Sequence, residues 1–145
     1  MHTLFNLKKE PFVLLLLATV ILLFALALRP IAHLDYEDKV MFGVPLDNMV
    51  WFIPFYLLTC WFIYLATKKS LYSTTMTWVH VMTTITPVFF IGILVYASIS
   101  PSTDTKDMDE LIGNAMQLMT IIFLWGQLLF LINIGLGMVK KTLSK

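Results

Sequence analysis

The sequence predicts an all-α integral membrane protein, with four transmembrane helices in an antiparallel bundle or arc. Composition, the length of the apolar segments and the placement of charges all indicate this class. Of the 145 residues, 59% are hydrophobic and only 13% are charged, and the mean hydropathy is +0.83. A soluble domain of this length cannot bury so much apolar surface, so the expected solvent is lipid.

The apolar segments lie at about 11–28, 49–67, 75–99 and 112–139, within a single domain that covers 1–145. Each is long enough to cross a hydrocarbon core that needs about 20 helical residues. The first segment, PFVLLLLATVILLFALAL, is longer than the apolar core of a signal peptide, and no small-residue cleavage motif follows it. We therefore expect a retained helix. The short connection KKSLYST predicts that the second and third helices are antiparallel neighbours.

The charges predict the orientation. The basic residues gather before the first helix, after the second and after the fourth, at Lys8, Lys9, Lys68, Lys69, Lys140, Lys141 and Lys145. Most of the acidic residues lie in the two other loops, about 29–48 and 100–111. The positive-inside rule then places both termini in the cytoplasm, and a bacterial inner membrane is the expected location. The outer loops are either solvated or a docking surface for a basic partner, and a net charge of +1 gives no reason to expect nucleic acid.

Polar side chains within the spans must find partners, because lipid offers none. A rise of about 1.5 Å per residue places them at matching depths. The depths predict two polar layers between helices, which pair His80 with Asn133 or Tyr64, and Gln127 with Thr86. Each such hydrogen bond is worth about 0.6–2 kcal/mol in a membrane bundle.

His80 has two interpretations. A neutral imidazole has one donor and one acceptor, so it fits a hydrogen-bonded packing role, with Thr84 one turn away on the same face. It also fits a haem or metal ligand, and Met76, four residues away on that face, is a candidate second ligand. Metal sites need several ligands at one level, and His2 and His33 lie on other segments. The residues favour the packing role and leave the ligand role open.

Two further features of the third and fourth helices concern packing. Pro87 removes the backbone bond to the carbonyl of Thr83, which predicts a kink. Gly126, Gly135 and Gly137 mark a face where another backbone can come close, either within the bundle or between protomers.

Three segments carry a resemblance to a known family. LDNMVWFIPFYLLTCWFIYLA, TTMTWVHVMTTITPVFFIGILVY and MQLMTIIFLWGQLLFLINIGLGMVKK resemble three consecutive helices of the large subunit (subunit I) of haem-copper oxidases. That family is built from three four-helix arcs, so the resemblance implies one arc here. It also implies haem binding or electron transfer within an oligomer, with a homotrimer as the first expectation. The family's histidine pair and His-x-His motif have no counterpart in this chain.

Three functional hypotheses follow. The first is a redox-related membrane subunit, an arc like that of the haem-copper oxidases that either binds haem as cofactor or packs against a redox partner. The second is a non-catalytic structural or assembly subunit of a larger membrane complex. The third is a small transporter or metal-handling protein, which the absence of acidic residues from the spans disfavours. No catalytic constellation is complete within one chain, so the sequence does not decide whether the protein is an enzyme.

Overall fold

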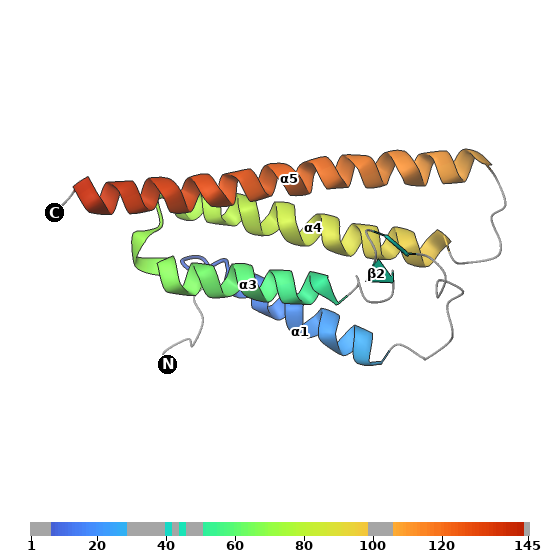
Figure 1. The fold of residues 1–145 in the computed structure, drawn as a ribbon, viewed down its shortest axis with the longest axis horizontal. Helices are drawn as coiled ribbons and strands as arrows, with labels where there is room; N and C mark the ends of the chain where they lie inside the picture. Colours follow the sequence, from blue (N-terminus) through green and yellow to red (C-terminus); the bar gives the residue numbers. More distant parts are fainter. Residues whose placement is uncertain (1–6, 29–39, 42–43, 46–50, 99–105, 144–145) are drawn as a thin grey trace. The chain divides into compact units, whose positions relative to one another are not determined.

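The computed structural model describes residues 7–28, 40–41, 44–45, 51–98 and 106–143. This part of the chain is almost entirely helical, which confirms the predicted all-α class (Figure 1). It contains the α-helices α1 (Val13–Ala27), α3 (Phe52–Thr67), α4 (Thr74–Ser98) and α5 (Lys106–Leu143). A short 3-10 helix, η1 (Lys68–Ser70), follows α3. The only strands in the described ranges are β1 (Val40–Met41) and β2 (Val44–Pro45), which pair antiparallel with Val40 opposite Pro45.

The helices lie where the apolar segments predicted them, and the largest difference concerns α5. This helix begins at Lys106 rather than 112 and ends at Leu143 rather than 139. Its extra turns are polar, so hydropathy alone could not include them. Acidic residues near a helix N-terminus and lysines near its C-terminus both stabilise the ends of a helix through its dipole.

Within the described residues, one helix is long and apolar enough to cross a membrane. It is the stretch Glu110–Leu143 of α5, which contains an 18-residue window with a mean hydropathy of 2.0. The apolar helix α1 has 15 residues and α3 has 16, and helices of that length span about 24 Å, less than the hydrocarbon core. The residues beside their outer ends lie outside the described ranges, so four complete spans stay a prediction.

Contacts divide the chain into two compact units, residues 1–68 and 69–145, and each is described by itself. The prediction of a single bundle concerns the arrangement of these units and stays a prediction. The loops at about 29–48 and 100–111 fall mostly outside the described residues, as do His2 and His33. The predicted orientation of the protein in a membrane is therefore also still a prediction.

In the first unit, α1 packs against α3. The chain enters α1 through turns in which the N–H groups of Val13 and Leu14 donate to the carbonyls of Glu10 and Pro11. The ring of Phe12 stacks on Tyr64 of α3 with centroids 5.7 Å apart. Other buried side chains of this unit follow helical spacing: Leu15, Ala18, Leu57 and Cys60. An ion pair between Glu10 and Lys68 joins the two ends of the unit.

In the second unit, α4 and α5 form an antiparallel hairpin (Figure 1). Its hydrogen bonds show the direction, because Thr77 pairs with Asn133 whereas Thr84, farther along α4, pairs with Gln127. The buried side chains of the hairpin are mostly polar or small, and the exposed ones are mostly large and apolar. This distribution is the reverse of that in a soluble helical hairpin.

Candidate functional site

The site of interest is a polar seam between α4 and α5, formed by Ser73, Thr77, His80 and Thr84 on one side and Gln127 and Asn133 on the other. Thr77, His80 and Thr84 are three and four residues apart, so they lie on one face of α4. All three are buried, as is Asn133. Every buried side-chain nitrogen or oxygen in the described residues has a hydrogen-bond partner.

At the centre of the seam is the His80 cluster, which consists of His80, Gln127 and Thr84. Nε2 of His80 lies 3.1 Å from Oε1 of Gln127. The amide nitrogen of Gln127 donates to Oγ1 of Thr84 at 3.1 Å and to the carbonyl of Phe123 at 3.2 Å. Because the Gln127 nitrogen is a donor in both bonds, its oxygen must accept from His80. His80 is therefore the tautomer that carries its proton on Nε2.

The same geometry tests whether His80 suits haem iron. Ligation through Nε2 requires a nitrogen without a proton, but this nitrogen donates to Gln127. One face of the ring stacks on Phe130, with centroids 4.6 Å apart and an angle of 20° between the planes. The side chain is 0% exposed. In this arrangement, haem ligation through Nε2 would require the bond to Gln127 to break.

Toward the lysine-rich end of α5, the seam continues as the Asn133 clamp, formed by Asn133, Tyr72, Ser73 and Thr77. The Asn133 side-chain oxygen accepts from the backbone N–H of Ser73 at 2.9 Å, and its amide donates to Oγ1 of Thr77 at 2.9 Å. Its backbone carbonyl accepts from the N–H of Tyr72 at 3.3 Å. The Thr77 hydroxyl donates to the carbonyl of Ser73, which closes the network. Asn133 thus satisfies two N–H groups just before α4, that of Ser73 through its side chain and that of Tyr72 through its backbone carbonyl.

Two glycines let α5 approach its neighbours closely. A Cβ added at Gly126 would collide with the side chain of Thr83, whose hydroxyl donates to the carbonyls of Val79 and His80. One added at Gly137 would collide with the backbone of Ser70. These contacts lie inside the second unit and agree with the predicted contact face. Gly135 differs, because nothing lies within 4 Å of its missing side chain.

The structure brings together most of the residues predicted for the site, but in different pairs. Gln127 bonds to His80 and Thr84, whereas Thr86, its predicted partner, is exposed. Asn133 bonds to Ser73 and Thr77 rather than to His80. Tyr64 is buried on α3 in the other unit. Helix rotation explains the difference, because residues at equal depth need not face each other.

Two other predictions concern Met76 as a candidate metal ligand and the kink expected at Pro87. Met76 lies in the first turn of α4 and is half-buried. Its backbone N–H donates to Oγ of Ser73 at 3.5 Å. In the described part of the chain, no group of three His, Cys, Asp or Glu side chains gathers to hold a metal. Pro87 lies inside α4, and the helix continues through it to Ser98.

Sequence reasoning missed Ser73 and Thr77. A serine just before a helix is the usual sign of a cap, and Ser73 precedes α4, so this signal was present. What it could not reveal was that Asn133 of the neighbouring helix binds the N–H of this serine. Comparison with protein-family models, curated proteins and solved structures found no match. The resemblance to haem-copper oxidases therefore rests on the three sequence segments alone.

Proposed function

We propose that this chain is an integral membrane subunit with a structural or assembly role, acting through contacts with other membrane proteins. Its polar seam joins two helices through hydrogen bonds between their side chains. The observation that carries this proposal is the hydrogen bond from His80 to Gln127 at 3.1 Å. It supports a packing role for His80, the histidine that the sequence places within an apolar span.

The membrane location is supported by the distribution of side chains in the hairpin. α5 exposes large apolar residues along one broad face: Leu118, Ile121, Leu124, Trp125, Leu128, Leu131 and Leu136. Water makes such a surface costly, whereas lipid does not. The buried Thr77, His80 and Asn133 meet the opposite requirement, because polar groups in lipid need protein partners. Small residues at the close contacts, such as Gly126 and Gly137, are typical of helix pairs in membranes.

The partner-binding role is supported by what the hairpin leaves open. Gly135 has no neighbour within 4 Å, so another helix can approach α5 there. A homo-oligomer, with the trimer implied by the oxidase resemblance, and a larger membrane complex are the two assemblies that use such a face. In the proposed topology, all four helices cross a bacterial inner membrane and both termini are cytoplasmic.

Three measurements on the purified protein test the proposal. Alkaline carbonate extraction should leave the chain in the membrane pellet, because an integral protein is released only by detergent. The optical spectrum in mild detergent should show no Soret band. Native mass measurement should give an oligomer, or a complex with other membrane proteins.

Two results would contradict the proposal. A stable monomer without partners in native extracts would remove the assembly role. A Soret band that the variant His80→Gln loses while its assembly survives would favour the haem-binding hypothesis instead.

A further inference from the structure

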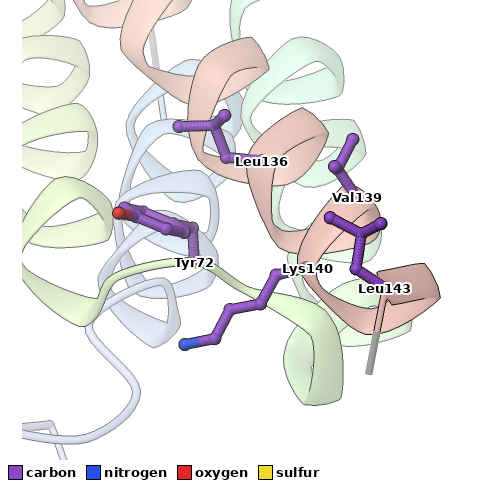
Figure 2. Close-up of a pocket in the computed structure, with 5 residues that line it drawn as sticks. All are labelled: Tyr72, Leu136, Val139, Lys140 and Leu143. Carbon is purple, nitrogen blue, oxygen red and sulfur yellow. The ribbon is translucent and has the colours of Figure 1, made fainter. Parts of the chain in front are cut away.

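A groove lies beside the last turns of α5, at the end of the hairpin that carries the Asn133 clamp. It is lined by Tyr72, Leu136, Val139, Lys140 and Leu143 and has a volume of about 410 Å³ (Figure 2). The four α5 residues follow helical spacing and form one face. Tyr72 comes from the segment just before α4, so two separate parts of the chain build the groove.

The lining combines two kinds of chemistry. Leu136, Val139 and Leu143 provide exposed apolar surface. Lys140 provides a positive charge, with its Nζ 5.9 Å from the centroid of the Tyr72 ring. In the described part of the chain, no carboxylate lies within ion-pair distance of Lys140. Among the described residues, the ammonium group therefore lies beside an aromatic face and near no carboxylate.

Hydrogen bonds to Asn133 hold the backbone of Tyr72, which lines one side of the groove. The backbone N–H of Tyr72 donates to the carbonyl of Asn133, and the next N–H, from Ser73, donates to the Asn133 side chain. Gly137 allows this segment to lie against α5, because the Tyr72 nitrogen is only 2.8 Å from where a Cβ would stand. The groove is thus set by the same contacts that join the two helices.

From this geometry we infer a binding site for a membrane phospholipid with an anionic head group. An acyl chain would lie along Leu136, Val139 and Leu143, and the phosphate would pair with Lys140. The Tyr72 hydroxyl is a further donor, and Figure 2 shows it pointing to the same side as the Lys140 ammonium. The charge and the apolar strip together match an anionic lipid better than a neutral one. The inference rests on the proposed membrane location.

Lipid titration of the purified, delipidated protein tests the site. Native mass spectrometry counts the phosphatidylglycerol or phosphatidylcholine bound to the full chain in mild detergent. The parent should prefer phosphatidylglycerol. Lys140→Gln should weaken phosphatidylglycerol binding about fivefold, which corresponds to about 1 kcal/mol per lysine near anionic lipid. Its binding of phosphatidylcholine should not change.

The matched control is Lys141→Gln. It also removes one positive charge, but from the next residue, whose side chain does not line the groove. It should leave phosphatidylglycerol binding within twofold of the parent. Tyr72→Leu keeps apolar surface but removes the ring and the hydroxyl, so it should also reduce the preference for phosphatidylglycerol. The mass of the assembly and the thermal midpoint of each variant show whether it is folded.

Four outcomes would overturn the inference. Equal losses in Lys140→Gln and Lys141→Gln would mean that only the general surface charge attracts the lipid. Inorganic phosphate that binds without lipid, and that displaces phosphatidylglycerol, would identify the ligand as a free anion. If the chain resists carbonate extraction but shows no preference for phosphatidylglycerol, the lipid site is wrong and the proposed membrane location still stands. Release by carbonate would end the proposed membrane location and this inference together.

Discussion

Asn133 of α5 accepts a hydrogen bond from the backbone N–H of Ser73, 60 positions earlier in the chain, at 2.9 Å. The first N–H groups of a helix have no partner within it, and a side chain just before the helix usually supplies one. Here Ser73 supplies its Oγ to the N–H of Met76 at 3.5 Å, and the neighbouring helix in turn binds the N–H of Ser73. The start of α4 and its packing against α5 therefore depend on the same residue.

The first prediction concerns this clamp. Asn133→Ala should lower the free energy of unfolding by about 1–3 kcal/mol, because the Ser73 N–H and the Thr77 hydroxyl lose a partner in a buried place. Unfolding in mild detergent, followed by circular dichroism, measures the change. Asn114→Ala is the matched control, since Asn114 is an exposed asparagine on the same helix. Equal stability of both variants would show that the clamp contributes nothing.

The second prediction separates two glycines of α5. Gly137→Ala should destabilise the hairpin by about 1–3 kcal/mol, because the new methyl group meets the backbone of Ser70, which cannot move cheaply. Gly135→Ala should leave the isolated chain unchanged or stabilise it by up to about 1 kcal/mol, since alanine is the better helix former and the space is open. The same unfolding measurement compares them.

Gly135→Ala also reports on assembly. If another protomer or subunit packs at Gly135, the variant should lose its partner in native mass measurement while the chain itself stays folded. An unchanged assembly would place the interface elsewhere on the helices. Destabilisation of the chain by Gly135→Ala as large as that by Gly137→Ala would contradict the open space around Gly135.

The sequence predicts the positions of the helices better than it predicts which side chains pair in the polar seam. Apolar runs located the described α-helices, because helix formation in these segments follows from length and hydropathy. The ends of α5 were missed because its outer turns are polar and look like loops. Gln127 was paired with Thr86 because the two share a depth, yet Thr84 is the partner and Thr86 is exposed. Depth follows from counting residues, whereas rotation about the helix axis depends on packing, including the close contact of Gly126 with Thr83.

The third prediction is topological. In a Cys60→Ser background, a cysteine placed at Asp107 should react with a membrane-impermeant reagent in intact cells, and one at Lys69 should not. The reason is that acidic loops face outward and lysine-rich ends stay in the cytoplasm. Both cysteines should react once the membrane is permeabilised, which controls for access. Reaction at position 69 alone in intact cells would reverse the orientation.

The last prediction concerns His80. Its Nε2–H donates to Gln127, and glutamine at position 80 keeps an N–H donor but is a poor ligand for iron. His80→Gln should therefore fold and assemble nearly as the parent does, with a stability within about 1 kcal/mol of it. His80→Leu removes the donor and should cost about 0.6–2 kcal/mol, the range for hydrogen bonds between helices in a membrane.

A double-mutant cycle shows whether these costs arise from the bond itself. Gln127→Leu should be destabilising in the parent and much less so in His80→Leu, because the bond from His80 is already lost there. Strictly additive costs would mean that the two side chains do not interact. Visible spectra of the same proteins test the ligand role. If His80→Gln keeps the parent's assembly but loses a Soret band that the parent has, the histidine binds haem and its bond to Gln127 is not its function.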